Sequence, residues 1–259
     1  MKRGIIVSLL AAITVGSVNA ADWTENVKVK GDLHYRHEVL DRDNDDVDAR
    51  HRQRIRARLA IDAKVSDNAR IVFGLASGSD DPISTNQTLG DAFTTKTIGI
   101  DLAYFELTPT NLKGLTLVGG KMKNPFYMPV ASELVWDSDL NPEGGAVLYG
   151  RDLDNVALRF VGAGLWIEER SGGDDTWLGA GQASARFAFN EKKSGVLVGG
   201  SFYNYVNMEG FPVIYDVEDP FGNSALDAGD GEFAYLTDFE LVELFAEVTH
   251  TIDDIPVAL

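Results

Sequence analysis

The chain has 259 residues, no cysteine, and 40 acidic against 23 basic residues, which gives a formal net charge of −17. The missing cysteines exclude a disulfide framework, thiol catalysis and cysteine-based zinc sites. The negative charge disfavours nucleic acid as a partner. Because the sequence contains no Gly-x-Ser-x-Gly elbow, no His-Glu-x-x-His and no phosphate loop, we predict neither catalytic residues nor a cofactor.

The first twenty residues have the pattern of a secretory signal peptide. Lys2 and Arg3 form a basic start, residues 4–15 are apolar, and residues 18–20 (Val-Asn-Ala) resemble a cleavage site. A buried N-terminal helix is the alternative. We expect a mature chain that begins near Ala21. No later apolar run approaches the 18 or so residues of a transmembrane helix, so a membrane could be crossed only by a closed β-barrel.

The first predicted strands alternate with a period of two, which is typical of a β-strand with one apolar and one polar face. Residues 26–39 place Val29, Leu33 and Tyr35 on one face. The strongest signal follows at 50–65, which is far longer than an ordinary globular strand. The charged face of these two segments carries Lys28, Lys30, Asp32, His34, Arg36, Glu38, Arg52, Arg54, Arg56, Arg58, Asp62 and Lys64.

Alternation recurs along the rest of the chain, and the gaps between strands are alternately long and short. In strand 97–108 the pattern places Ile98, Ile100, Leu102 and Tyr104 on one apolar face. Long loops on one side and short turns on the other are typical of an outer-membrane β-barrel. The further strands that we expect lie at about 70–77, 97–108, 115–123, 144–151, 156–169, 176–189, 195–207 and 232–251, with the start of another at 256–259.

The fold class predicted is therefore all-β, an antiparallel transmembrane β-barrel over residues 21–259 after a signal peptide over 1–20. About ten strands are present, and the chain ends at Leu259 partway into a strand. Bacterial single-chain barrels have an even strand count. We therefore expect the C-terminal strands of a barrel of roughly 16 strands to be missing.

Three segments carry a resemblance to a known family. Residues 75–91, 119–126 (Gly-Gly-Lys-Met-Lys-Asn-Pro-Phe) and 132–144 are similar to a family of bacterial outer-membrane porins, and the likeness covers about 26–259. The resemblance implies a water-filled β-barrel pore in a protein longer than this chain. It assigns no substrate and no site residues. Since many diffusion porins are trimers, a homotrimer is one assembly it implies.

The arginines of strand 50–65 are the first functional candidate. Guanidinium groups suit carboxylate and phosphate, and charged rows that line a pore set its selectivity. Alternatively, the row pairs with acidic residues of neighbouring strands, such as Asp32 and Glu38, and braces the wall. The candidate pore-lining residues are Arg52, Arg54, Arg56, Arg58, Asp62, Lys64, Lys28, Lys30, Asp32, Arg36, Lys121 and Lys123.

The long loop 124–143 is the second candidate, because it is too apolar for a freely solvated surface loop. We expect it either to fold into the barrel mouth as a constriction or to pack on top of the barrel. The residues that we assign to a constriction are Phe126, Tyr127, Glu133, Trp136 and Asp137.

The acidic loops do not form an EF-hand, since Asp46 stands where that motif requires glycine and Arg52 where it requires glutamate. Loose cation binding at Asp41–Asp48 or Asp227–Glu232 is an alternative to solvated acidic loops. The histidines lack metal spacing, so no metal site is predicted.

These observations together predict an outer-membrane porin, a passive diffusion channel for small hydrophilic solutes or ions, with outer-membrane lipid as its surroundings. A secreted soluble β-sandwich or lectin-like module is the main alternative, because one face of an antiparallel sheet can pack on a core. Partitioning into the outer membrane would separate these two. A barrel enzyme such as a lipase is the third class, for which the sequence offers no Ser/His pair.

Overall fold

The computed structural model describes residues 23–40, 49–189, 193–252 and 255–258. The predicted signal peptide and the acidic loop Asp41–Asp48 lie outside these ranges. Among the described residues no helix is long and apolar enough to cross a membrane.

The protein consists almost entirely of antiparallel strands with short helical turns. The helical turns are α1 (Trp23–Asn26) and the 3-10 turn η1 (Pro129–Ala131). The strands are β1 (Val27–Leu40), β2 (Arg50–Ser66), β3 (Ala69–Ser77), β4 (Gln87–Thr88), β5 (Ile98–Leu107), β6 (Leu115–Lys121), β7 (Glu143–Leu153), β8 (Val156–Glu168), β9 (Thr176–Phe189), β10 (Ser194–Val206), β11 (Ala225–Gly229), β12 (Glu232–Tyr235), β13 (Phe239–Ile252) and β14 (Ile255–Ala258).

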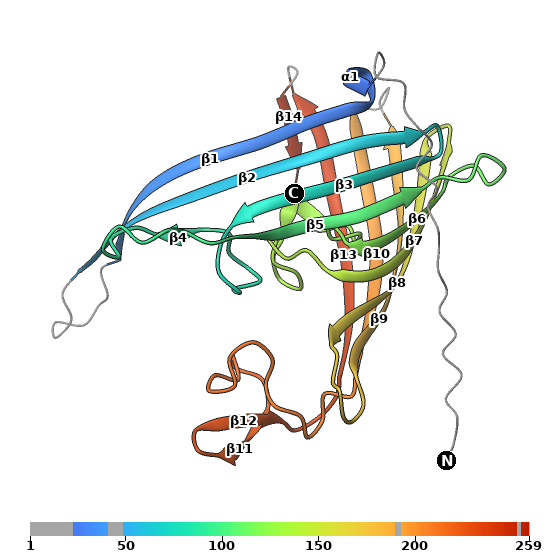
Figure 1. Ribbon diagram of the computed structural model, residues 1–259. Helices are drawn as coiled ribbons and strands as arrows, with labels where there is room; N and C mark the ends of the chain where they lie inside the picture. Colours follow the sequence, from blue (N-terminus) through green and yellow to red (C-terminus); the bar gives the residue numbers. More distant parts are fainter. Residues whose placement is uncertain (1–22, 41–48, 190–192, 253–254, 259) are drawn as a thin grey trace, which may run out of the picture.

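One sheet of twelve strands contains all of these strands except β11 and β12. Its order is β1-β2-β3-β5-β6-β7-β8-β9-β10-β13-β14, with β4 added beside β2 where β3 has ended. Figure 1 shows the sheet curling round so that β1 to β5 lie across from β10 and β13. Within the described residues β1 and β14 do not pair, so the sheet is curled but open. The all-β antiparallel prediction is confirmed.

The two faces of the sheet differ sharply. The convex face carries exposed apolar side chains along its whole width, including Leu33 (76 % exposed) on β1 and Leu244 (84 %) on β13. The concave face is charged along β1 to β3 and packed along β8 to β10, where Leu165 and Leu178 are at most 1 % exposed. This division follows from period-two alternation. The core of the molecule therefore lies inside the curl.

The predicted apolar face of strand 97–108 is wrong in its second half. Asp101 is an extra residue in the pairing with β3, because Gly74 pairs with Leu102 and Leu75 with Ile100. Such a β-bulge reverses which face later residues take. Ile98 and Ile100 are exposed on the convex face, whereas Leu102 is 6 % exposed inside the curl. Tyr104 follows Leu102 to the inner side.

The predicted strand 232–251 is also wrong, because it is two strands of different sheets. β12 pairs with β11 in a hairpin, and β13 begins only at Phe239. Asp238 lies between β12 and β13, and its carboxylate accepts hydrogen bonds from the backbone N–H groups of Met208 and Glu209. Phe233 and Tyr235 are in phase with Phe239 and Leu241 at the start of β13, and this period of two hides the break.

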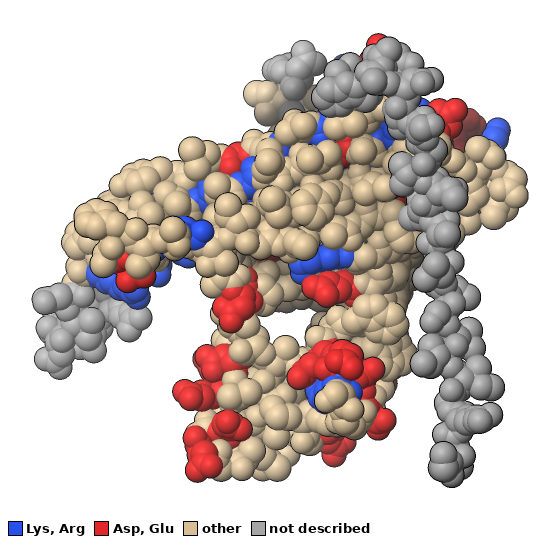
Figure 2. Space-filling view, in the orientation of Figure 1, with Lys and Arg blue, Asp and Glu red and all other residues tan. Residues whose placement is uncertain are grey.

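The hairpin belongs to a lobe, residues 207–238, that has a small core of its own. Met208, Val213 and Tyr235 are each less than 8 % exposed. Figure 2 shows acidic side chains gathered over this lobe. Its acidic residues are Glu209, Asp216, Glu218, Asp219, Asp227, Asp230, Glu232 and Asp238.

Candidate functional site

A row of guanidinium groups lies on the concave face of β1 and β2. Register places Arg36, Arg54 and Arg56 on the same face as Asp32 and Glu38. Five arginines share these two carboxylates, so positive charge remains in excess. Glu38 pairs with Arg36, with Arg52 at 2.6 Å and with Arg54 at 3.8 Å, while Asp32 pairs with Arg56 at 3.1 Å and Arg58 at 2.8 Å.

These contacts are the bracing pairs with Asp32 and Glu38 that the sequence suggests. Both carboxylates bridge two or more arginines, which keeps the side chains extended along the wall. The excess of arginine over acid still leaves the row positively charged. Bracing and attraction of anions are therefore compatible.

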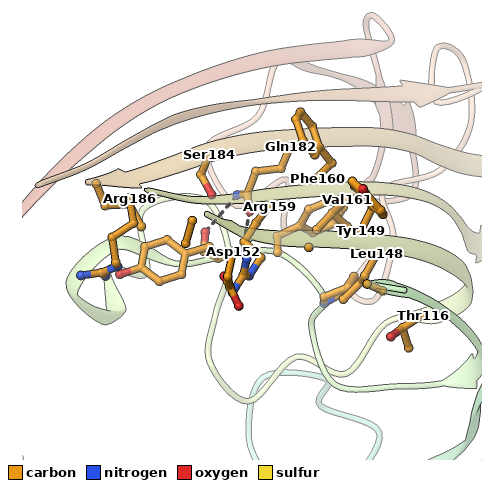
Figure 3. Close-up of a pocket in the computed structure, with 17 residues that line it drawn as sticks. Thr116, Leu148, Tyr149, Asp152, Arg159, Phe160, Val161, Gln182, Ser184 and Arg186 are labelled. Carbon is orange, nitrogen blue, oxygen red and sulfur yellow. Dashed lines mark hydrogen bonds and ion pairs between the residues drawn. The ribbon is translucent and has the colours of Figure 1, made fainter. Parts of the chain in front are cut away.

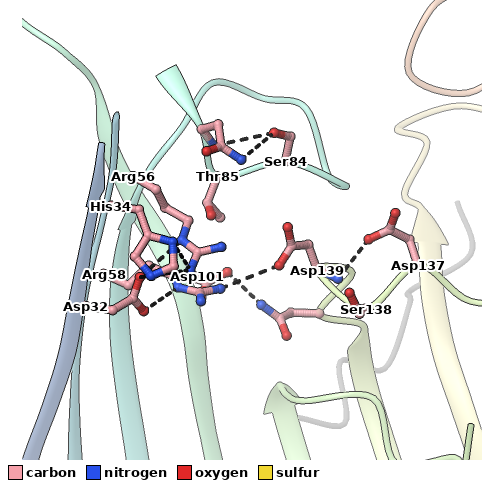
Figure 4. A network of polar contacts seen from close by, with 12 residues as sticks. Asp32, His34, Arg56, Arg58, Ser84, Thr85, Asp101, Asp137, Ser138 and Asp139 are labelled. Carbon is pink, nitrogen blue, oxygen red and sulfur yellow. Dashed lines mark hydrogen bonds and ion pairs between the residues drawn. The ribbon is translucent and has the colours of Figure 1, made fainter. Parts of the chain in front are cut away.

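The row ends at a contact with the long loop. Arg58 lies 3.5 Å from Oδ1 of Asp139, and Asn141 donates a 2.6 Å hydrogen bond to Asp101 on β5. Figure 4 shows Arg56 and Arg58 on one side of this network and Asp137 and Asp139 on the other. Positive charge on the wall thus faces negative charge on the loop.

The remaining predicted pore-lining residues on β1 and β2 continue the same face toward the short turns. Lys30 lies 3.5 Å from Asp62, and Lys64 pairs with Asp67 of the β2–β3 turn at 2.7 Å. Lys28 belongs to the same face and stands directly opposite Asp62 in the β1–β2 ladder.

The two predicted lysines that follow β5 occupy different places. Lys123 lines a cavity of about 290 Å³ together with Lys30, Asp32 and Arg58, so it joins the inner face. Lys121 instead forms a 2.9 Å ion pair with Glu143 and donates to the carbonyl of Asn141. It therefore closes the base of the long loop and stands apart from the arginine row.

The apolar half of the long loop packs on the inner wall. Phe126 (5 % exposed) and Trp136 (6 %) stack at 5.7 Å and both contact the ring of Tyr203 on β10. Leu165 and Leu178 complete the cluster. This burial explains why the loop is apolar: the two aromatic side chains fix it to β8, β9 and β10.

Polar contacts clamp the same loop. The side-chain amide of Gln182 on β9 accepts from the backbone N–H of Tyr127 at 2.7 Å and donates to its carbonyl at 3.0 Å. Glu247 on β13 accepts from the Tyr127 hydroxyl at 2.5 Å and from the N–H of Val130 at 3.1 Å. Val130 adopts a left-handed backbone (φ 48°), which is uncommon for a β-branched residue and here accompanies the N–H contact with Glu247.

The loop therefore runs through the interior of the curl. It contacts β13 at Tyr127 and β2 at Asp139, and seven strands separate β13 from β2 in the sheet order. Phe126 and Trp136 are buried against Leu165, Leu178 and Tyr203 on the concave face, which places this stretch of the loop on the inner side of the sheet. The loop thus lies along the concave face of the open sheet, and its role as a constriction stays a prediction.

Two further loop residues stabilise its turn. Glu133 accepts from the N–H of Ser138 at 3.1 Å, and Asp137 accepts from the N–H of Asp139 at 2.7 Å. The hydroxyl and the N–H of Ser138 lower the pKa of Glu133. Both carboxylates are thus engaged with the backbone of the loop.

Sequence reasoning missed the partners on the opposite wall. These are Gln182, Arg186, Ser201, Glu243 and Glu247. On the wall of the arginine row itself it missed Arg70 of β3, which binds Asp62 and Glu106 at 2.7 Å each. Gln182, Ser184 and Arg186 alternate with small and aromatic residues, and Glu243 and Glu247 alternate with apolar ones. The same period-two signal could have assigned them to the inner face.

No group of three or more His, Asp or Glu within the described ranges is arranged to hold a metal ion. Asp227 and Glu232, which flank the second acidic segment, lie in the β11–β12 hairpin. The charged inner face therefore consists of ion pairs and hydrogen bonds.

A curled antiparallel sheet with an apolar convex face, a charged concave face and an inserted loop defines a porin-like β protein. Residues 40–220 match the family model described as "Putative porin". This match covers more than half of the chain, so the protein belongs to that family, as the resemblance of its three segments predicted. No curated protein matches the chain.

Proposed function

We propose that the protein is a passive diffusion channel of the bacterial outer membrane that admits small hydrophilic solutes or ions. The observation that carries this proposal is the loop 124–143 inside a sheet whose concave face is charged and whose convex face is apolar. An exposed apolar convex face suits lipid, and a charged concave face suits a water-filled lumen. Export by the signal peptide over 1–20 would deliver the chain to that membrane.

The loop is the proposed constriction. It carries Phe126, Tyr127 and Trp136 against one wall and presents Asp139 to Arg58 on the other. A solute that passes the loop would cross the gap between the arginine row and the acidic loop. Because the row holds more positive than negative charge, we expect a preference for anions.

Single-channel conductance in a planar bilayer under a KCl gradient tests both points. We expect discrete current steps and a reversal potential that indicates chloride preference. Deletion of residues 126–136 should raise the conductance, and an unchanged conductance would contradict the constriction. A folded protein that inserts without current would contradict the channel, and a signal-cleaved protein that stays out of the outer membrane would favour a secreted β-sheet module.

A further inference from the structure

A cavity of about 650 Å³ lies on the inner wall beneath the long loop (Figure 3). This is the size range of small-molecule sites. Asp152 and Ala157 flank the short β7–β8 turn, so the cavity lies at the short-turn end of the sheet. Residues Pro125, Phe126 and Tyr127 of the loop line its other side.

The two arginines that border the cavity point away from its middle, and each is engaged with a carboxylate of its own. Arg159 lies across Gly150 of β7, where an added Cβ would come within 3.2 Å of its side chain, and pairs with Asp152 at 2.7 Å. Arg186 reaches instead toward β13, where it pairs with Glu247 at 3.2 Å. Each pair is neutral as a whole, so the middle of the cavity has no unpaired positive charge beside it.

The hydroxyl of Ser184 lies between these two arginines. Ser184 on β9 stands directly opposite Arg159 on β8, and Arg186 is the next residue of β9 on the same face (Figure 3). Within the described part of the chain the Ser184 hydroxyl has no hydrogen-bond partner, and neither has the hydroxyl of Thr116, which lines the cavity from β6. A hydroxyl is uncharged and can both donate and accept a hydrogen bond. The cavity therefore offers neutral polar groups to a ligand.

The rest of the lining is mainly apolar. Leu148, Val161 and Leu197 form the wall beside the hydroxyls. Gln182 also borders the cavity, but both ends of its amide are engaged with Tyr127. A charged ligand would lose its hydration here without gaining an unpaired counter-charge, and a polyol would place most of its hydroxyls against apolar side chains. A neutral molecule with an apolar body and one hydroxyl matches both parts of the lining.

We propose that this cavity binds small uncharged molecules that combine a ring with one hydroxyl group, the chemistry of a phenol. The ring would pack on Leu148 and Val161, and the hydroxyl would form a hydrogen bond with Ser184. Small-molecule sites commonly combine an apolar wall with a few polar groups that fix the orientation of the ligand. The inference goes beyond the proposed function, because retention of such molecules concerns this cavity and does not depend on conduction.

Isothermal titration of the folded, detergent-solubilised full chain with phenol at pH 7 tests the site, and titration of the detergent alone supplies the baseline for phenol that enters micelles. We expect saturable phenol binding and at least tenfold weaker binding of benzoate, which has the same ring and a negative charge. The variant S184A should weaken phenol binding about fivefold, since it loses a hydrogen bond between uncharged groups. S171A is the matched control, because Ser171 lies in the β8–β9 loop at the opposite end of these strands, and its affinity should be unchanged.

A second variant, S184F, fills the cavity with a ring of the protein itself and should abolish phenol binding. Benzoate binding as tight as that of phenol, or full phenol affinity in S184A and S184F, would overturn the proposal. S184A removes only one oxygen atom and keeps the test decisive if S184F fails to fold. The titration needs no bilayer, so it separates the two proposals. A protein that conducts but does not bind phenol contradicts only this cavity site, and one that binds phenol without conducting contradicts only the channel.

Discussion

The hydroxyl of Tyr127 donates a 2.5 Å hydrogen bond to Glu247, a residue 120 positions further along the chain. The same carboxylate accepts from Val130 and pairs with Arg186 at 3.2 Å, and the residue is 4 % exposed. One side chain of β13 thus joins the inserted loop to β9. Its carboxylate therefore holds both a side chain and a backbone N–H of the loop.

The variant E247A should free this end of the loop. Loss of these hydrogen bonds to a charged group is expected to cost about 2–3 kcal/mol of unfolding free energy, and single-channel current should become larger and noisier. Urea unfolding and bilayer recordings measure the two effects. Glu240 lies on the same strand without an ion pair among the described residues, so E240A is the control. A single-channel current of unchanged size and noise in E247A would contradict the attachment of the loop by Glu247.

The aromatic attachment predicts a second effect on stability. Trp136 is buried against Phe126 and Tyr203, so W136A should lower the unfolding free energy by about 3–5 kcal/mol. Leu134 in the same loop is 88 % exposed, and L134A should change the unfolding free energy by less than about 0.5 kcal/mol. Urea denaturation monitored by far-UV circular dichroism, a backbone signal that does not depend on the removed tryptophan, distinguishes the two variants. Equal losses would indicate that the loop has no anchored side.

How far the sequence predicts this structure depends on the range of the interaction. Alternation is local, so it identified β1, β2 and most later strands and assigned Arg52 to Arg58 to the charged face. It failed at Tyr104, because a bulge at Asp101 depends on pairing with β3. It could not find Glu247 as the partner of Tyr127, since that contact depends on the curl of the whole sheet.

The arginine row predicts the direction of ion selectivity. Arg54 makes a long contact of 3.8 Å with Glu38, so its loss removes little. Asp32 keeps Arg58 as a partner when Arg56 is removed. The variant R54Q/R56Q should therefore fold while losing two positive charges, and its reversal potential should move toward that of a cation-preferring pore. K113Q, in the β5–β6 turn, removes a positive charge away from the row and should leave selectivity unchanged. The same shift of the reversal potential in both variants would mean that selectivity follows the net charge of the protein and not the position of the arginine row.

Arg70 braces the adjoining strands. Its guanidinium binds Asp62 with two hydrogen bonds of 2.7 and 2.8 Å and Glu106 with one of 2.7 Å. R70Q leaves two carboxylates facing each other and should cost about 1–3 kcal/mol in urea unfolding. Among the described residues Lys64 pairs only with Asp67, whose side chain is 95 % exposed, so K64Q should cost less than about 1 kcal/mol. A smaller loss in R70Q than in K64Q would contradict this bracing role.

Alkaline pH should loosen the loop through Tyr127. Burial and the hydrogen bond to Glu247 raise the pKa of the Tyr127 hydroxyl to about 12, against an ordinary value of about 10. A raised pKa in the folded state means that the contribution of this group to stability is complete below pH 10 and is lost as the pH rises toward about 12. Urea unfolding across this range should show a decline that Y127F lacks and Y149F retains, since Tyr149 lies outside the clamp. A decline of equal size in Y127F would assign the alkaline transition to other groups.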